Sequence, residues 1–190
     1  MTKYIILIVI LVVFLLATLL YCLRSALGGT RTGEEDLPLT EEKEEPTSSD
    51  NFVVDMYERV YKKCNYGEEM ETLSPYERVF YITQELEGEV NNGGFSQFFF
   101  NSSGNFSGEI VQAFTEIGAH ETAAICKRAL AAFGCALPAD RDAREELLDS
   151  LDWDSINPIL SECDSDFYAY PDDLNALNQA YIQKHIEYFK

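Results

Sequence analysis

The chain has 190 residues and a net charge of -19 at pH 7, from 33 Asp and Glu against 14 Lys and Arg. One ordinary domain takes roughly 100 to 200 residues, so the length indicates a single domain with additional segments. An excess of negative charge this large disfavours direct binding to nucleic acid and to anionic lipid, because both attract cationic surfaces. A basic protein is the partner that this charge favours.

The first segment of note, residues 4–23, contains no charged residue. At about 1.5 Å per residue, a helix of this length spans the ~30 Å hydrocarbon layer of a bilayer. We therefore predict one transmembrane helix within residues 1–24, with cleavage after it as the alternative. Lys3 and the terminal amine on one side balance Arg24 and Arg31 on the other, so these charges do not decide the orientation.

Residues 25–50 hold eight acids, two bases and almost no large apolar residues. Such a segment cannot offset the entropy that it would lose on folding, so we predict a disordered acidic linker. The acidity continues beyond it, because residues 51–190 hold 25 acids against ten bases. The remaining segment, residues 51–190, is predicted to form one compact acidic domain.

The chain contains five cysteines, of which one lies in the predicted transmembrane helix and four in the predicted domain. They are Cys22, Cys64, Cys126, Cys135 and Cys163. No pair has the Cys-x-x-Cys spacing of a zinc knuckle or a redox motif. We predict that the four domain cysteines are small apolar core residues, with two disulfides in an oxidising compartment as the alternative.

The predicted domain begins with two helices. Apolar residues recur at helical spacing over residues 51–64, which indicates the first helix. A capping box marks the start of the second, with an N-cap serine, a proline in the first turn and a glutamate three residues after the cap. These residues are Ser74, Pro75 and Glu77. Gly93 and Gly94 predict the end of this helix, ahead of a short aromatic segment over residues 95–100.

Four further helices follow the aromatic segment. Two of them end at Gly118 and Gly134 and form an αα-hairpin. Asp140 is predicted to cap the next helix, which runs through Leu151, and Asp172 to begin the last one. Alternating runs of the β type are absent from the sequence, so we predict an all-α, multi-helix domain.

The sequence offers few groups for catalysis or metal binding. Only two histidines exist, and His120 opens a sequence like the zinc-protease motif His-Glu-x-x-His, in which Ala124 replaces the second ligand. The acidic runs at 152–154, 164–166 and 172–173 lack the glycine and final glutamate of a calcium loop, so helix capping and a solvated surface explain them better. We predict that the chain is not an enzyme and holds no metal and no cofactor.

The string Asn91-Asn92-Gly93-Gly94-Phe95 has two interpretations. In the first, two glycines permit a sharp reversal that brings the aromatic segment into the core. In the second, the exposed amides and free backbone N–H groups of the turn hold a small ligand. The first interpretation treats these five residues as a structural motif, and the second treats them as a binding or enzymatic site.

The stretch from Glu85 to Phe99, which contains this string, is followed by Asn101-Ser102-Ser103-Gly104. Together they resemble the signature of the bacterial DNA-mimic protein family, also catalogued as a domain of unknown function, and the likeness extends over residues 52–189. The resemblance implies an all-helical fold, homodimerisation and acids that imitate DNA phosphates to occupy a DNA-binding regulator. It also favours the cytoplasmic side of the membrane. The membrane segment and the acidic linker depart from the usual family pattern.

We therefore predict a membrane-anchored acidic interaction protein that sequesters a basic, DNA-binding partner. The acids predicted to contact the partner lie in two groups. They are Glu85, Glu87 and Glu89, and Asp149, Asp152 and Asp154. An immunity-type protein that neutralises a basic toxin is a related interpretation. A small-ligand-binding or enzymatic domain that uses the turn at residues 91–95 is the alternative from a different class.

Overall fold

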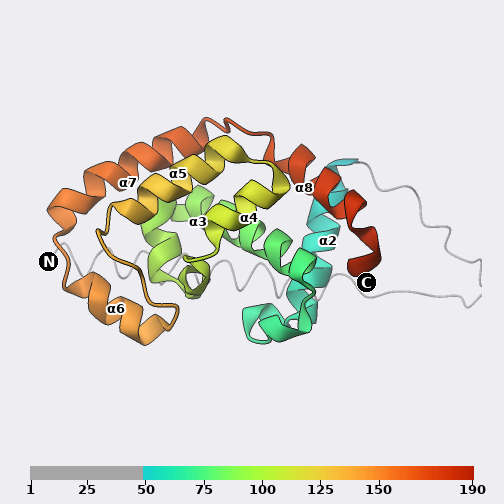
Figure 1. The fold of residues 1–190 in the computed structure, drawn as a ribbon, viewed down its shortest axis with the longest axis horizontal. Helices are drawn as coiled ribbons and strands as arrows, with labels where there is room; N and C mark the ends of the chain where they lie inside the picture. Colours follow the sequence, from blue (N-terminus) through green and yellow to red (C-terminus); the bar gives the residue numbers. More distant parts are fainter. Residues whose placement is uncertain (1–48) are drawn as a thin grey trace, which may run out of the picture. The chain divides into compact units, whose positions relative to one another are not determined.

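The computed structural model describes residues 49–190, with side chains from Phe52 onward. The predicted transmembrane helix within residues 1–24, and the predicted linker up to residue 48, lie outside the described residues. Between residues 49 and 190 there are seven α-helices and no strand, which confirms the all-α prediction (Figure 1). No helix in this range has the length and apolar character needed to cross a bilayer.

The helices succeed one another with short connections. The α-helices are α2 (Ser49–Lys63), α3 (Pro75–Phe100), α4 (Ile110–Ile117), α5 (His120–Ala131), α6 (Arg141–Asp149), α7 (Trp153–Tyr168) and α8 (Leu174–Lys184). Four short 3-10 helices lie between or after them: η1 (Asn65–Gly67), η2 (Met70–Thr72), η3 (Ser102–Phe106) and η4 (Ile186–Tyr188). The predicted helix starts at Ser74 and Asp140 are confirmed, because both residues accept N-cap hydrogen bonds.

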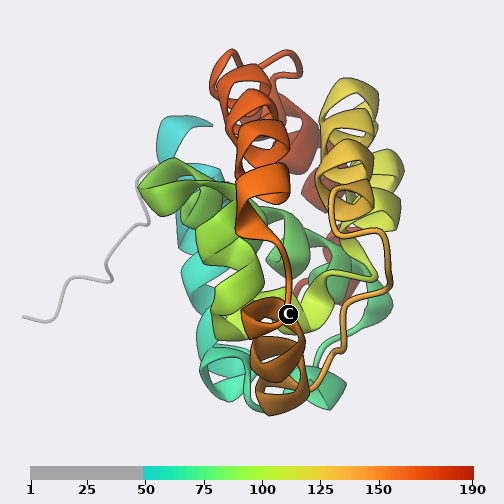
Figure 2. The same ribbon diagram turned by 90° about the vertical axis from the view of Figure 1, so that its left-hand side faces the viewer.

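Helix α3 is the central element, and it packs against α2, α4, α6, α7 and α8. Its buried side chains include six aromatic or aliphatic residues with no exposed surface: Phe80, Leu86, Val90, Phe95, Phe98 and Phe99. Helices α5 and α7 lie side by side in both ribbon views (Figures 1 and 2). Helix α6 lies at the end of the domain away from α2 and α8 (Figure 1).

The capping box at the start of α3 also ties α3 to α2. The Ser74 hydroxyl accepts a hydrogen bond from the Glu77 backbone N–H at 3.2 Å, and the Glu77 carboxylate accepts one from the Ser74 backbone N–H at 2.8 Å. Glu77 is only 1% exposed, and Lys63 Nζ lies 2.7 Å from its Oε1. The buried carboxylate therefore has both a positive partner and a hydrogen-bond donor, as burial of a charge requires.

Helix α7 is an element that the sequence analysis did not predict. It contains Pro158, which lacks the backbone N–H for a helical hydrogen bond and so disguises the helix. Its buried residues nevertheless follow helical spacing, at Ile156, Leu160, Cys163 and Phe167. Asp152 is the N-cap of this helix, which confirms the prediction that this acidic run serves helix capping.

Two predicted helix boundaries and one cysteine need correction. The helix capped by Asp140 ends at Asp149, short of Leu151. The last helix has Asp173 as its N-cap, because Asp172 instead accepts hydrogen bonds from the backbone N–H and the hydroxyl of Thr122 in α5. Among the four domain cysteines, all of which are free thiols, Cys135 is exposed and so is not a core residue.

Candidate functional site

The Asn-Asn-Gly-Gly-Phe string bends α3 sharply instead of ending it. Gly94 has a φ of +79° and a ψ of 177°, a combination that is essentially open only to glycine. A Cβ atom at this position would lie 2.5 Å from Oδ2 of Asp164. Oδ1 of the same carboxylate accepts a hydrogen bond at 2.7 Å from the backbone N–H of Phe95. The bend directs Phe95 into the core, and Asp164 supplies the partner that the interrupted helix cannot.

Arg144 of α6 lies beneath the second half of the signature, with none of its surface exposed. Its guanidinium donates to four backbone carbonyl oxygens at 2.8 to 3.1 Å, those of Phe99, Asn101, Pro138 and Ala139. A Cβ atom at Gly104 would lie 2.8 Å from Arg144 Nε and 2.7 Å from the Phe99 oxygen. The glycine of the Asn-Ser-Ser-Gly string is therefore required so that this arginine can approach the backbone.

Glu89 joins the two strings of the signature through its carboxylate. Asn101 Nδ2 donates to both of its oxygens, at 3.0 and 2.8 Å. Gln97 Nε2 and the Ser103 hydroxyl donate to one oxygen each. Glu89 is half-buried, so these four hydrogen bonds replace water around its charge and hold the carboxylate in one orientation.

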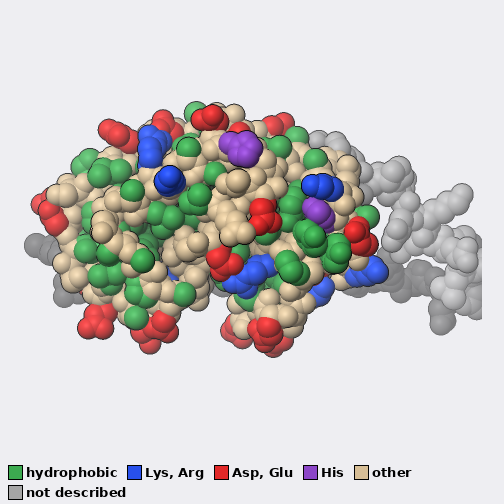
Figure 3. Space-filling view, viewed as in Figure 1, with side chains coloured by type: hydrophobic (Ala, Val, Ile, Leu, Met, Phe, Trp, Pro, Cys, Tyr) green, Lys and Arg blue, Asp and Glu red, His purple; other side chains and the backbone are tan. Residues whose placement is uncertain are grey.

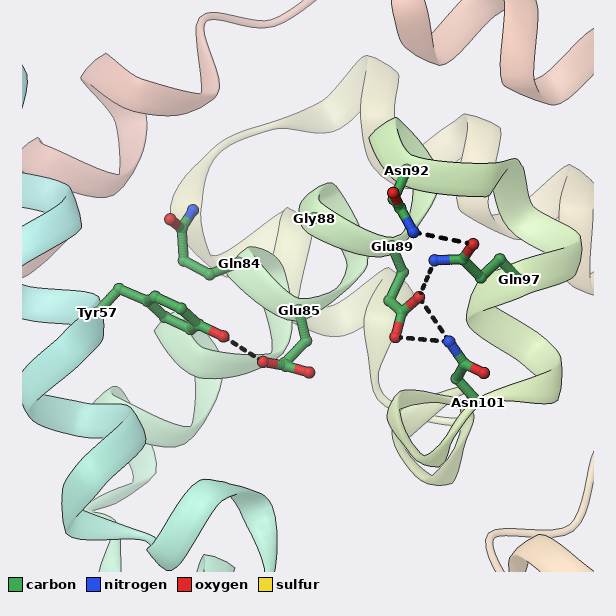
Figure 4. Close-up of a pocket in the computed structure, with 8 residues that line it drawn as sticks. All are labelled: Tyr57, Gln84, Glu85, Gly88, Glu89, Asn92, Gln97 and Asn101. Atoms are coloured by element: carbon green, nitrogen blue, oxygen red, sulfur yellow. Dashed lines mark hydrogen bonds between the residues drawn. The ribbon is translucent and has the colours of Figure 1, made fainter. Parts of the chain in front are cut away.

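A hollow of about 400 Å³ opens beside this carboxylate, between α2 and the first half of α3 (Figure 4). It is lined by Tyr57, Gln84, Glu85, Gly88, Glu89, Asn92, Gln97 and Asn101. Glu85 and Glu89 project from successive turns of α3, and the Tyr57 hydroxyl of α2 donates to Glu85. The hollow thus combines two carboxylates, three side-chain amides of the signature and an aromatic ring.

A second hollow, of about 350 Å³, shares Tyr57, Gln84 and Gly88 with the first. It contains Glu87 of the same helix, whose carboxylate accepts hydrogen bonds at 3.2 Å from Gln84 Nε2 and from the Tyr170 hydroxyl. Burial raises the pKa of the Glu87 carboxyl, and these two hydrogen bonds oppose that rise. Glu85, Glu87 and Glu89 of α3 therefore all lie within hollows.

Burial also raises the pKa of the Glu85 carboxyl, the hydrogen bond from Tyr57 opposes the rise, and the nearby Glu89 charge adds to it. A raised pKa means that the folded state favours the protonated carboxyl. Ionisation of Glu85 therefore lowers the free energy of unfolding as the pH rises through the folded-state pKa, and this loss disappears below the unfolded-state pKa. At neutral pH the ionised Glu85 carboxylate therefore lowers the free energy of unfolding of the domain.

We expect Glu85→Gln to raise the free energy of unfolding at pH 7.5, because glutamine fills the same space and carries no charge to desolvate. The gain should shrink as the pH is lowered to 4, where the wild-type carboxyl becomes protonated. Urea unfolding of both proteins over this pH range measures the effect. Glu162→Gln, at an exposed position of α7, is the control. A gain that grows towards pH 4 would contradict the assignment.

The six acids predicted to contact a partner lie in two separate places. Glu85 and Glu89 line the first hollow and Glu87 lines the second. The other three acids, Asp149, Asp152 and Asp154, are exposed where α6 ends and α7 begins, and they line neither hollow. Asp152 also accepts hydrogen bonds from the Asp154 backbone N–H and the Ser155 hydroxyl. The prediction that these six acids bind a partner stays a prediction.

Helix α6 contributes further acids that the sequence analysis did not select. Asp142, Glu145, Glu146 and Asp149 follow the spacing i, i+3, i+4, i+7, so they share the face opposite the buried Arg144. Figure 3 shows acidic side chains along the edge of the domain that α6 forms. Arg141 pairs with Glu145 at 2.7 Å. The helical spacing in the sequence is the signal that could have revealed this face.

Within residues 49–190, neither the histidines nor the acidic runs form part of a metal-binding group. His120 is the exposed first residue of α5, and Ala124 follows it one turn later. Among residues 49–190, no group of three or more His, Cys, Asp or Glu side chains is arranged to hold a metal ion.

Comparison with known proteins identifies the family. The family model described as DMP19-like protein matches residues 71–185, which include the bend in α3, the Asn-Ser-Ser-Gly string and helix α6. The chain belongs to the DMP19-like protein family. This is a DNA-mimic family, so the resemblance stated from the sequence is confirmed. No curated protein and no solved structure matches the chain. Homodimerisation, which the resemblance implies for DMP19-like proteins, stays a prediction.

Proposed function

We propose that this domain binds a Lys- and Arg-rich surface of a DNA-binding protein and occupies it in place of DNA. We define the acidic α6 face as Asp142, Glu145, Glu146, Asp149, Asp152 and Asp154, and we assign the contacts to it. Three of these six acids belong to the set predicted from the sequence. Membership of a DNA-mimic family supports this class of partner, and the arrangement of charge on α6 supports the choice of surface.

The spacing of charge along α6 is the observation that carries the proposal. Residues 142 to 149 span about 10 Å of helix axis, at about 1.5 Å per residue. Four carboxylates over that length, of which Glu145 is paired with Arg141, give about one carboxylate per 3 Å, which is close to the one charge per about 3.4 Å of a single DNA strand. The guanidinium of Arg144 is buried on the opposite face, so it does not interrupt the row.

The same proposal includes membrane attachment through residues 4–23, with the linker giving the domain its reach. A DNA-binding protein is a cytoplasmic target, so the domain must face the cytoplasm. A fluorescent reporter that matures only in the cytoplasm, fused after Lys190, should therefore be bright, and an alkaline phosphatase fused at the same place should be inactive. The opposite pair of signals would exclude a cytoplasmic DNA-binding partner.

The partner-binding surface is tested by removing its charge. Five substitutions, Asp142→Asn, Glu146→Gln, Asp149→Asn, Asp152→Asn and Asp154→Asn, neutralise every acid of the acidic α6 face except Glu145, which pairs with Arg141. The matched control neutralises five exposed acids elsewhere, Glu68, Glu71, Glu121, Glu162 and Glu187, and so has the same net charge. We expect the first variant to lose at least about tenfold in affinity for a captured basic partner, a change of about 1.4 kcal/mol. The control variant should lose much less.

The partner is obtained by capture from bacterial lysate on the full-length chain at low salt, followed by elution with duplex DNA. A DNA-mimic partner should be released by DNA and by raised salt, because both act on the same cationic surface. A partner that DNA does not release would instead support the immunity-type interpretation. Equal losses in the two variants would show that net charge alone, and not the acidic α6 face, drives binding.

A second candidate function is the binding of a small ligand beside the turn at residues 91–95. The observation that favours it is the first hollow, since its 400 Å³ lies within the ~300 to 1,000 Å³ of known ligand sites. Asn92 and Gln97 of the signature line this hollow, so the string has an accessible polar surface as well as a structural bend. The chemistry of the hollow decides which ligand it would accept.

A further inference from the structure

We infer that the first hollow binds a guanidinium group, held between Glu85 and Glu89 and beside the hydroxyl of Tyr57. The inference rests on the ligand-binding candidate above and is independent of the acidic α6 face. It names the ligand class: the side chain of an arginine in a protein, or a free alkylguanidine.

The hollow concentrates negative charge without a cation of its own. Glu85 and Glu89 are four residues apart on α3, so their carboxylates lie on one face, and like charges at this spacing repel. None of the eight lining residues is Lys, Arg or His. Each of the five ion pairs found among the described residues involves other carboxylates. A bound cation would offset this repulsion.

Each side-chain donor atom of the hollow already has a partner, and acceptors remain as well. The side-chain donors of Tyr57, Gln84, Asn92, Gln97 and Asn101 each donate to another side chain. The amide oxygens of Asn92 and Asn101 receive no donor from the part of the chain that the structure describes. Glu89 already accepts four hydrogen bonds and so contributes mainly its charge, whereas Glu85 and the two amide oxygens favour a ligand that supplies donors. Guanidinium has five N–H donors and no acceptor.

The Tyr57 ring stacks on Tyr61 and Tyr81, and its hydroxyl end points into the hollow towards Glu85 (Figure 4). A guanidinium is more weakly hydrated than an ammonium group, so it loses less on entering a half-buried site. The hydrogen bond from the Tyr57 hydroxyl also fixes one oxygen of Glu85. The carboxylate is therefore held in orientation before the ligand arrives.

Gly88 provides an independent observation. It lies in the middle of the first half of α3, where a glycine destabilises a helix relative to alanine. A Cβ atom at this position would meet no atom within 4 Å, so packing within the fold does not require the glycine. Its open side faces the hollows, since it lines both of them. Gly88 is exposed and has no packing role, and its missing side chain leaves room in the hollow for a ligand.

The test follows binding at the hollow itself by NMR of the full-length chain in detergent micelles. N-acetyl-arginine amide is titrated, and N-acetyl-citrulline amide, which replaces the guanidinium by a neutral urea of the same shape, is the matched control. We expect saturable shifts in the signals of Gly88, Gln97 and Asn101 with the arginine compound, and at least about tenfold weaker binding of the citrulline compound. Butylguanidine is the free alkylguanidine and has the same single charge: binding as tight as that of the arginine compound assigns the site to small molecules, and weaker binding assigns it to arginine in a protein.

Two variants complete the test. Gly88→Leu should fill the hollow and abolish the shifts while the helix stays folded, because its Cβ atom meets no atom within 4 Å and leucine is a strong helix former. Glu85→Gln should weaken binding of the arginine compound at least about fivefold and leave the binding of the citrulline compound unchanged.

The outcomes separate the two proposals. Equal shifts from the arginine and citrulline compounds would overturn the guanidinium assignment and leave ligand binding in place. Shifts spread over the surface acids, or unchanged binding in Gly88→Leu, would overturn both the guanidinium assignment and ligand binding at the first hollow. Binding of the arginine compound in a variant without the acidic α6 face would show that the hollow acts independently of that face.

Discussion

Replacing Arg144 by leucine should destabilise the domain more than removal of any ion-paired arginine, although Arg144 has no carboxylate partner. Its four acceptors are the backbone oxygens of Phe99, Asn101, Pro138 and Ala139. A buried acceptor left without a donor costs about 1 to 3 kcal/mol, so the loss should reach about 3 kcal/mol or more. Domain stabilities are only about 5 to 15 kcal/mol, so this loss is a large part of the total.

Arg128→Leu is the matched control for this prediction. Arg128 forms an ion pair with Asp166, but both side chains are about half exposed, and pairs of this kind contribute roughly 0 to 1 kcal/mol. Burial lowers the pKa of Arg144, and its hydrogen bonds hold the cation in place despite this. Urea unfolding of the three proteins at pH 7 measures both losses. A smaller loss for Arg144→Leu than for Arg128→Leu would refute the role given to the buried guanidinium.

The second large effect is expected for Gly94→Ala, which should lower the free energy of unfolding by about 3 kcal/mol or more. The backbone conformation at this position costs a non-glycine residue roughly 1 to 3 kcal/mol. The new Cβ atom would also lie 2.5 Å from Asp164, so the carboxylate must move and the Phe95 N–H loses its partner. Thermal or urea unfolding measures the change.

Gly88→Ala, six residues earlier in the same helix, should have the opposite sign. Its Cβ atom would meet nothing within 4 Å, and alanine in a helix interior is favoured over glycine by about 0.5 to 1 kcal/mol. The double variant Gly94→Ala with Asp164→Ala should lose less than the sum of the two single variants, because each removes the same hydrogen bond. Equal effects of alanine at positions 88 and 94 would show that the bend is not needed for stability.

Local signals in the sequence predicted the beginnings of helices well. The capping box at Ser74 and the cap at Asp140 involve residues that are neighbours in sequence, and both are present in the structure. Helix α7 was missed because Pro158 interrupts its pattern, although its apolar residues keep the helical period. Packing against α3 and α5 stabilises this helix, and such packing cannot be read from one segment.

The candidate site shows the same limit. Glu85, Glu87 and Glu89 look like surface charges in the sequence, because nothing local reveals that Tyr57 and Tyr170 meet them from distant parts of the chain. In the sequence alone, Arg144 likewise looks like one more surface charge of an acidic helix. Glu85, Glu87 and Arg144 have contacts with positions 28 to 83 residues away, whereas the partners of Glu89 are 8 to 14 residues away.

Arg144 binds backbone carbonyl oxygens, which every type of amino acid has. The attachment of α6 through this residue therefore does not depend on the side chains of the neighbouring segments. The outward residues of α6 can therefore be exchanged as a set while the helix keeps its place. A library of α6 sequences that varies only residues 142, 145, 146 and 149 would yield proteins of one architecture and many recognition patterns. The outward surface of α6 can therefore vary independently of the fold that holds the helix.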